Sequence, residues 1–408
     1  MREGWSLKPL GELTHQFVDP CTIEPDQTYV NLGLRMYAKG VFSREPKLGS
    51  EMKAIRLFRV RPGQFIYNRM FAAGGSFGRV PPELAGGVVS NEFPVYDVDE
   101  SSLLPEFLHL YFQQPSVWRE VERECTGTTK SRLRWKEELF AKRVIYLPPL
   151  DEQRRIVDLI GALDDAIEAA ENQRATVDAV LDGLAEQLLF SGSERCQVPV
   201  SDLAEKRGLI GGPFGSSLVS HDYVESGVPI IRGTNMPKSG RYVWGDFAYV
   251  SEAKAESLRR NHAIPGDVIF TQRGTLGQVG LVPAEGPPQY VISQSQMRLR
   301  VNDELVTAGY IYHIFRSTRM VGRIKALNTA TANPHINLGI LAKIDIPLPP
   351  LDEQAAICST LDSVQAAAGE AQQFAIALHT LRSELLTALL SGAHEIPDTY
   401  DEVMTAAV

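Results

Sequence analysis

The sequence contains few cysteines and no long hydrophobic run. Its 408 residues include four cysteines that lie far apart and form no Cys-x-x-Cys pair. This spacing argues against a zinc ribbon and a disulfide framework, and it favours a reducing compartment. No window reaches the roughly 18 apolar residues of a membrane-spanning helix, and the N-terminus lacks the apolar core of a signal peptide. We therefore expect a cytoplasmic protein without a membrane partner.

The sequence also lacks the motifs of enzymes that modify DNA or hydrolyse ATP. The nearest match to the (N/D)PP(Y/F) motif of adenine methyltransferases, Asn333-Pro334-His335, has neither the second proline nor the aromatic residue. The stretch GGPFGSSL at 211–218 has the glycines of a phosphate-binding loop but no lysine. The eight histidines form no HxxxH or HExxH pair. We expect no catalytic residue, no metal site and no cofactor in this chain.

The acidic residues are unevenly distributed. The formal net charge is −9, and the segments 151–190 and 352–391 and the tail 394–408 each have a negative net charge. The two intervening regions are mildly basic, which fits a partner that carries phosphates. The acidic residues of the two long segments are interpreted as solvated helix faces, in preference to a nuclease metal site.

One heptapeptide, LPPLDEQ, occurs twice, at 147–153 and at 348–354. Two prolines can end a strand and lead into a helix, but they cannot lie inside either element. The carboxylates that follow suit the first turn of a helix, where exposed amides favour anions. Each copy therefore predicts a stiff connection between a strand and a helix.

The segment after each copy has apolar residues at alternating steps of four and three. This spacing predicts a long helix with a coiled-coil seam or subunit interface, although an ordinary amphipathic helix in a globular core would show a similar pattern. Connectivity requires the two helices to be antiparallel if their seams meet, over a length of roughly 60 Å. The predicted seam residues are Ile156, Ile160, Leu163, Ile167, Leu181, Leu184, Leu188, Ile357, Leu361, Val364, Leu378, Leu385 and Leu389.

The globular halves repeat more faintly. VRPGQFIY (60–67) resembles AIPGDVIF (263–270), and GVVSNEF (87–93) can be aligned with YVISQSQ (290–296). Residues 108–121 and 311–324 each have the pattern of one helix. The predicted fold is α+β, with two globular domains separated by two long antiparallel helices in a pseudo-two-fold repeat. The predicted boundaries are 1–146 and 194–347 for the domains, 147–193 and 348–393 for the helical spacers, and 394–408 for the acidic tail.

This order of segments, together with GGPFGSSLVSHDYVESGVPIIRGTNM (211–236), resembles the specificity subunit of type I restriction–modification systems, the HsdS family. The resemblance covers nearly the whole chain, although the first half lacks a GPFGS-like stretch, which implies a domain of a different sequence subtype. It implies two target-recognition domains that read the halves of a bipartite, asymmetric site in double-stranded DNA. It also implies two adenine methyltransferase subunits that supply S-adenosylmethionine chemistry, and it allows motor–nuclease subunits that use ATP and Mg.

Candidate DNA-binding residues are cations for phosphates and forked or amide side chains for base edges. Arg69 follows the strand FIYN. Arg273 follows IFTQ in the second half and is the expected counterpart of Arg69 there. The stretch TGTTKSRLRWK (126–136) and the region that corresponds to it in the second half both lie shortly before LPPLDEQ. The alternative for each is a plain basic surface or, for GGPFGSSL, a tight turn that needs glycine. The candidates are Arg69, Lys130, Arg132, Arg134, Ser216, Arg232, Asn235, Arg273, Asn333 and His335.

A scaffold or adaptor whose duplicated domains bind protein ligands is the rival interpretation. The basic loops favour a DNA-binding, non-catalytic specificity subunit over this rival.

Overall fold

A computed structural model describes residues 2, 4–52, 56–127, 133–191, 195–238, 240–327, 335–397 and 399–400. The chain divides into two compact units. Unit 1 comprises Met1–Ala169 and Ile376–Val408, and unit 2 comprises Ala170–Ala375. Each unit has its own large hydrophobic core. Each unit therefore contains the first part of one long helix and the last part of the other.

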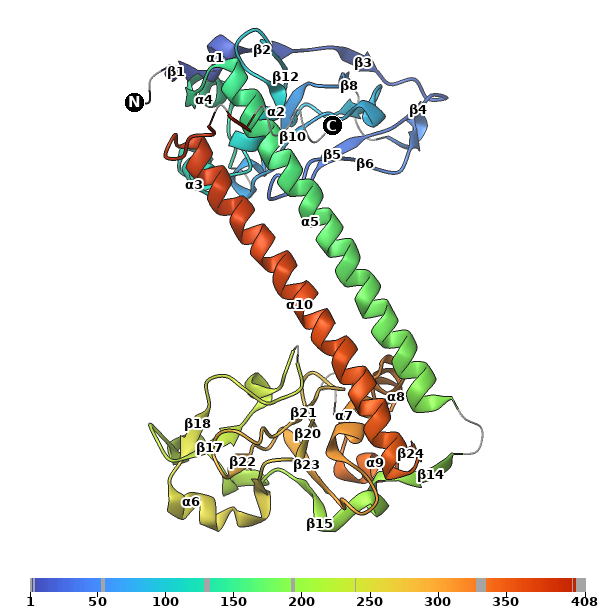
Figure 1. The fold of residues 1–408 in the computed structure, drawn as a ribbon. Coiled ribbons are helices and arrows are strands. Elements are labelled where there is room, and N and C mark those ends of the chain that lie inside the picture. The colour runs from blue at the N-terminus through green and yellow to red at the C-terminus, as the bar shows by residue number, and fades with distance from the viewer. Residues whose placement is uncertain are drawn as a thin grey trace. The chain divides into compact units, whose positions relative to one another are not determined.

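The two long helices are α5 (Leu150–Ala185), which continues into a π-helical turn at Glu186–Phe190, and α10 (Leu351–Leu390). In unit 1, Ile160 at the start of α5 shares a core with Leu386 near the end of α10, and Arg382 forms an ion pair with Asp164 at 2.8 Å. In unit 2, Ala185 at the end of α5 shares a core with residues in the first turns of α10. Within each unit the two helical segments therefore run in opposite directions (Figure 1).

Every residue predicted to lie on the seam is buried or half-buried. Ile160 and Leu361 have no exposed surface, and Ile156, Ile357 and Leu389 are almost as deeply buried. The spacing of four and three places these residues on one helix face, which is the face that each unit covers. Their participation in a coiled coil between the two long helices and in a subunit interface stays a prediction.

The predicted connection between strand and helix is confirmed at both copies of LPPLDEQ. Strand β13 (Val144–Leu147) is followed by two prolines and α5, and strand β24 (Asp345–Leu348) by two prolines and α10. Each strand pairs with a partner from the beginning of its globular segment: β13 with β1 (Ser6–Pro9), and β24 with β14 (Cys196–Pro199), both antiparallel. These pairs close each globular segment at the point where its long helix begins.

Unit 1 is built on a four-stranded sheet in the order β10-β9-β12-β2 and a three-stranded sheet in the order β11-β8-β3. Two further two-stranded pairs, β4–β7 and β5–β6, complete its described strands. The core lies between the four-stranded sheet and the helices, where Phe65, Phe77 and Phe140 are fully buried. The strands are β2 (Thr14–Phe17), β3 (Pro20–Thr22), β4 (Thr28–Tyr29), β5 (Leu32–Leu34), β6 (Val41–Ser43), β7 (Lys47–Leu48), β8 (Arg56–Arg59), β9 (Phe65–Tyr67), β10 (Phe77–Arg79), β11 (Val88–Val89) and β12 (Val95–Val98).

Unit 2 is built on a four-stranded sheet in the order β15-β23-β20-β21 and a five-stranded sheet in the order β16-β18-β17-β22-β19 (Figure 1). Strands β17 and β22 are parallel, and the other described neighbours are antiparallel. The strands are β15 (Ala204–Gly211), β16 (Tyr223–Val224), β17 (Val228–Ile231), β18 (Ala248–Val250), β19 (His262–Ala263), β20 (Val268–Thr271), β21 (Val279–Leu281), β22 (Tyr290–Ile292) and β23 (Gln296–Val301).

The helical stretches 108–121 and 311–324 were each predicted as one helix, and this was wrong. Each contains two helices: α2 (Pro105–Tyr111) and α3 (Pro115–Glu124) in unit 1, and α7 (Ala308–Arg316) and α8 (Thr318–Ala326) in unit 2. Pro115 begins α3, and the Ser317 hydroxyl accepts a hydrogen bond from the Met320 amide at 3.2 Å, so each break has a local cause. The short helices are α1 (Leu10–Leu13), α4 (Glu137–Lys142), α6 (Glu252–Ser257) and α9 (Leu338–Ala342).

Within the described residues, no helix combines the length and the apolar character needed to cross a bilayer.

Candidate nucleic-acid interface

The last residue of LPPLDEQ connects each long helix to its globular segment. Gln153 is fully buried. Its Oε1 accepts a hydrogen bond from the Leu104 amide at 2.9 Å, and its Nε2 donates to the carbonyl oxygens of Ser102 and Pro148, both at 2.9 Å. Buried hydrogen bonds of this kind are costly to break, because each leaves a desolvated polar group without a partner. Gln153 therefore fixes the first turn of α5 against the loop before α2.

Gln354 makes the same set of contacts in unit 2. It is also fully buried, and its Oε1 accepts from the Thr307 amide at 2.9 Å. Its Nε2 donates to the carbonyl oxygens of Leu305 at 3.0 Å and Pro349 at 2.9 Å. The first turn of α10 is thus held against the loop before α7.

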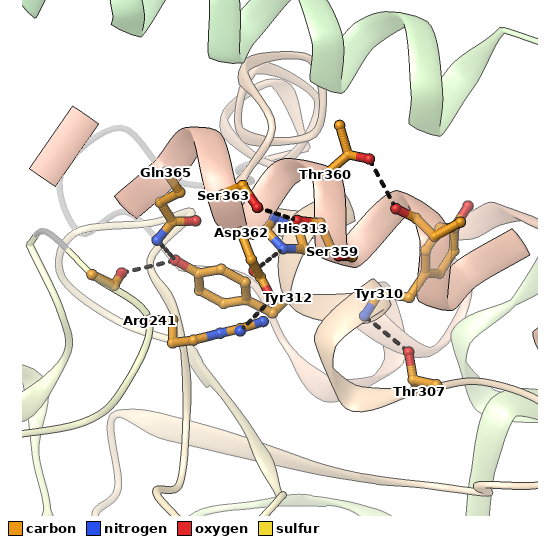
Figure 2. Close-up of polar contacts among 12 residues, drawn as sticks. Arg241, Thr307, Tyr310, Tyr312, His313, Ser359, Thr360, Asp362, Ser363 and Gln365 are labelled. Atoms are coloured by element: carbon orange, nitrogen blue, oxygen red, sulfur yellow. Dashed lines mark hydrogen bonds and ion pairs between the residues drawn. The ribbon is translucent and has the colours of Figure 1, made fainter. Parts of the chain in front are cut away.

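A polar cluster joins α10 to a loop of unit 2 (Figure 2). Asp362 on α10 contacts Arg241 and the Nε2 of His313, each at 2.7 Å. The Tyr312 hydroxyl donates to the carbonyl oxygen of Gly240 at 2.8 Å and receives a hydrogen bond from the side chain of Gln365. Burial lowers the pKa of His313, against the opposing effect of Asp362.

These contacts hold the loop between β17 and β18 in one arrangement. The Val243 amide donates to the carbonyl of Leu281 at 2.9 Å, and the Trp244 amide donates to the carbonyl of Asn235 at 3.0 Å. The loop nevertheless leaves the Trp244 indole 64% exposed. An exposed aromatic side chain on a fixed backbone suits contact with a partner, because little conformational freedom is lost on binding.

The hairpins β9–β10 and β20–β21 have the same backbone connections at the residues that follow their first strands, β9 and β20. We call these places the hairpin mouths. In unit 1 the Arg69 amide donates to the carbonyl of Glu92, and the Arg69 carbonyl accepts from the Trp135 amide, both at 3.0 Å. In unit 2 the Gln272 amide donates to the carbonyl of Ser295 at 2.7 Å, and the Gln272 carbonyl accepts from the Ile336 amide at 3.1 Å. The residue that corresponds to Arg69 is therefore Gln272, and the assignment of Arg273 to that place was wrong by one position.

The charge of Arg69 is used within unit 1. Its guanidinium lies 3.2 Å from Glu137 and 3.9 Å from Glu92, and it also donates to the carbonyl of Asn91. Arg134, a second candidate, forms an ion pair with the same Glu92 at 3.0 Å. These two candidates thus come together around one carboxylate, which leaves less of their charge for a phosphate. Lys130 and Arg132 lie outside the described residues.

Arg273 is exposed, and its backbone forms an isolated antiparallel bridge with His335. The structure therefore brings together two candidates that lie far apart in the sequence. Asn333, the third candidate of this group, lies outside the described residues.

A pocket of about 490 Å³ lies beside these candidates in unit 2. Arg232 is one of its lining residues, and the Nε of Arg232 is buried without a hydrogen-bond partner. The side chain of Gln294 donates to the carbonyl oxygens of Gly215 and Leu218 at 2.9 and 3.0 Å, so the exposed turn that contains Ser216 is fixed to the pocket rim. The other lining residues are Val219, Ser220, Tyr223, Gly233, Ser293 and Ser295.

Asn235 lies in the interior of unit 2, whereas Arg232 is half-buried and lines the pocket. It is fully buried, its Nδ2 donates to the carbonyls of Trp244 and Asp246 at 3.2 and 3.1 Å, and its Oδ1 accepts from the Arg232 amide at 3.0 Å. All of these partners are in the chain itself. Asn235 therefore supports the backbone on which Arg232 lies.

The serines of this pocket were missed from the sequence. Ser293 and Ser295 lie in YVISQSQ, which was noted only as a faint counterpart of GVVSNEF. The signal that could have identified them is the replacement of Glu92 by Ser295 at the aligned position, which removes a carboxylate beside a predicted arginine.

Comparison with known proteins agrees with this geometry. Residues 222–373 match the family model of the type I restriction modification DNA specificity domain. The type I restriction enzyme MjaVIII specificity subunit of Methanocaldococcus jannaschii is 22% identical over 242 residues, which are 56% of each chain. The putative MjaX specificity subunit of the same organism is 22% identical over 274 residues, or 63% of this chain and 60% of the relative.

Solved structures share the fold over almost the full length. One solved structure comes from work on the structural basis of complex assembly and conformational transition of the type I R-M system. It matches this chain with a TM-score of 0.63 at 20% identity, and the match covers 96% of this chain and 98% of that chain. The HsdS subunit from Thermoanaerobacter tengcongensis has a TM-score of 0.51 with the same identity and coverage. The S subunit from M. genitalium has a TM-score of 0.54 at 12% identity, with 94% and 96% covered.

Part of the chain thus matches the type I restriction modification DNA specificity domain, and the chain is similar to specificity subunits of the HsdS family. Its mixed arrangement of helices and sheets is the fold of HsdS structures. The sequence matches span somewhat more than half the length of the two HsdS relatives from M. jannaschii.

Proposed function

We propose that this chain is the non-catalytic DNA-specificity subunit of a type I restriction–modification complex and reads a bipartite, asymmetric site. The observation that carries the proposal is the pair of hairpin mouths. Their backbone connections are equivalent, but one presents Arg69 beside Glu92 and the other Gln272 beside Ser295. Two readers with one framework and different side chains are what two unlike half-sites require.

The proposed organisation follows the predicted boundaries. Residues 1–146 and 194–347 are the two target-recognition domains, 147–193 and 348–393 are the spacers, and 394–408 is an acidic tail. The two spacers form an antiparallel coiled coil of roughly 60 Å that relates the domains by a pseudo-two-fold axis and sets the distance between half-sites. Support comes from the identical contacts of Gln153 and Gln354 and from the opposed helical segments in each unit.

The proposed partners are double-stranded DNA and two adenine methyltransferase subunits. The methyltransferase subunits carry S-adenosylmethionine, and motor–nuclease subunits that use ATP and Mg join the same complex in the prokaryotic cytoplasm. The spacers provide the docking surface for these subunits.

Within the DNA-binding set, the described residues divide by role. Arg273, His335, Arg232 and Ser216 are proposed to contact DNA, because they lie at the hairpin mouth or at the pocket and its rim. Arg69 and Arg134 are proposed to shape the corresponding mouth in unit 1, with contact supplied by Lys130 and Arg132. Asn333 completes the set in unit 2, and Asn235 positions Arg232.

The test is to select bound duplexes from a random pool with the full chain and its methyltransferase partner, followed by a mobility-shift assay. A specificity subunit enriches one sequence and binds it in preference to a scrambled duplex of equal length and composition. Equal binding of both duplexes, or none, would contradict DNA reading and favour a scaffold that binds protein ligands.

A further inference from the structure

The pocket around Arg232 has the composition of an anion site. Its lining residues include one guanidinium, the hydroxyls of Ser220 and Ser295, and Ser293, whose hydroxyl is hydrogen-bonded to the side chain of Gln296. No carboxylate belongs to the described residues that line it. No hydrogen bond or ion pair occupies the Arg232 side chain in the described part of the chain, and its Nε is shielded from solvent. The Nε–H of Arg232 thus lacks an internal acceptor, and the residue as a whole is only half-buried, so the rest of its guanidinium can meet an acceptor that enters the pocket from outside.

The carboxylate of Asp222, which precedes the lining residue Tyr223, forms contacts outside the pocket. Asp222 accepts a hydrogen bond from the Val219 amide at 2.8 Å and pairs with Lys254 at 3.0 Å. These contacts lower the pKa of Asp222, which stays charged and paired outside the pocket lining. Among the described residues that line the pocket, no carboxylate therefore competes with a bound anion for Arg232.

In unit 1, a carboxylate occupies the position that Ser295 occupies in unit 2. Glu92 lies at the position of Ser295, because its carbonyl accepts the hydrogen bond from Arg69 that Ser295 accepts from Gln272. Glu92 lies within ion-pair distance of Arg69 and Arg134. In unit 2 the serine at this position lines the pocket without bringing a carboxylate to it.

We propose that the pocket lined by Arg232, Ser220, Ser293 and Ser295 binds a phosphate group of the DNA backbone. The proposal rests on the proposed DNA-reading function. Arginine and serine hydroxyls are common phosphate ligands, and the pocket is large enough for a phosphate with its attached sugar.

The pocket wall continues directly into the hairpin mouth. The carbonyl of Ser295 accepts from the Gln272 amide at 2.7 Å and from the Arg273 amide at 3.4 Å. A phosphate held by Arg232 would therefore lie beside the loop that presents Arg273. Such a contact fixes the register of the duplex while Arg273 reaches a base edge.

The experiment compares three variants of the pocket with one control in the full-length complex. Arg232→Gln removes the charge, and Ser295→Glu introduces the carboxylate that unit 1 has at this position. Arg259→Gln removes an equal charge from an exposed arginine of unit 2 outside the pocket, and Ser295→Ala removes only the hydroxyl. Unfolding midpoints of all four are measured first, to restrict the comparison to folded proteins.

Arg232→Gln is expected to weaken binding of selected and random duplexes alike, on the order of tenfold. It should reduce the slope of log affinity against log salt by about 0.9, the value for one phosphate contact. Ser295→Glu should weaken binding at least as much, and Ser295→Ala, which removes one hydroxyl of the pocket without adding a charge, should weaken it less than Ser295→Glu. The Arg259→Gln control stays within about threefold of the parent chain. Ethylation interference should show one phosphate whose modification weakens the parent complex but not the Arg232→Gln complex.

The outcomes distinguish a failure of the proposed DNA-reading function from a failure of the phosphate pocket. Parent binding without any preferred duplex would contradict the proposed function itself. A normal preference in the parent, with Arg232→Gln and Ser295→Glu unchanged in affinity and salt slope, would overturn only the phosphate pocket. If Arg232→Gln abolished binding of inorganic phosphate or ATP to the free chain and left DNA affinity unchanged, the pocket would serve a free phosphate compound and the proposal would be wrong.

Discussion

Gln153 and Gln354 make the same three hydrogen bonds, each within its own unit. Each accepts from the amide just before a helix, α2 in unit 1 and α7 in unit 2, and donates to two carbonyls, one of which belongs to the LPPLDEQ copy itself. The duplicated heptapeptide is therefore a structural joint between a strand, a long helix and a globular segment, and its glutamine belongs to the core.

Replacing Gln354 with Leu tests the joint. The change removes three hydrogen bonds of a fully buried side chain, so the free energy of unfolding of unit 2 should fall by about 3 kcal/mol. Gln373→Leu, on the exposed side of the same helix, should change it by less than about 0.5 kcal/mol. Urea unfolding followed by circular dichroism measures both. Equal midpoints for the two variants would show that the joint contributes nothing.

Ile160→Asp tests the seam of α5. Ile160 has no exposed surface and shares a core with Leu386 of α10, so a buried charge there should destabilise unit 1 by about 3–5 kcal/mol. Ala166→Asp introduces the same charge at an exposed position of α5 and should be nearly neutral. The readouts are the unfolding midpoint and co-purification with the methyltransferase. A folded, assembling Ile160→Asp protein would contradict the seam assignment.

Arg69 and Arg273 should respond differently to the same substitution. Arg69→Met leaves Glu137 without its described partner, so it should destabilise unit 1 by about 1 kcal/mol. Arg273→Met should leave stability unchanged and reduce discrimination in one half of the recognised sequence by about 1–3 kcal/mol. Unfolding and binding titrations on duplexes with single substitutions measure the two effects. The reverse pattern would mean that Arg69 is the reader.

His109 predicts an acid-sensitive unit 1. Burial and the charges of Arg79 and Arg382 lower its pKa to about 4, against the opposing charge of Asp164, and its Nδ1 is buried without a partner. The unfolded chain binds this proton more readily, so the stability that a neutral His109 provides is present at pH 7 and is lost as the pH falls from about 6.5 towards 4. Between pH 7 and 5 the parent chain should lose roughly 1–2 kcal/mol more than His109→Gln. The measurement is urea unfolding of both at the two pH values. Identical losses would show that this proton is not linked to folding.

The long helices were predictable because their signals are local. Prolines at 148–149 and 349–350 mark the entries to the helices, and the spacing of Ile156, Ile160 and Leu361 requires one buried helix face. The pairing of β1 with β13 was not predictable in this way, because it joins strands at opposite ends of a globular segment. The break at Ser317 was missed because a serine cap inside an apolar pattern is a weaker signal than a proline.

The sequence indicates candidate residues by their type, but it does not indicate which side chains they contact in the fold. Arg69 and Arg232 look alike in the sequence, yet the first meets two carboxylates and the second none among the residues that line its pocket. The difference depends on Glu92 and Ser295, which come from distant positions and reach the site only through the fold. Asn235 was misjudged for the same reason, since its burial depends on the later residues Trp244 and Asp246.

Mapping the methylated adenines of a host genome, with and without this chain, tests the central claim most directly. Two unlike readers held at a fixed distance predict one motif made of two short specified segments with an unspecified spacer of constant length. A motif that is continuous or palindromic, or methylation that does not depend on the chain, would contradict it.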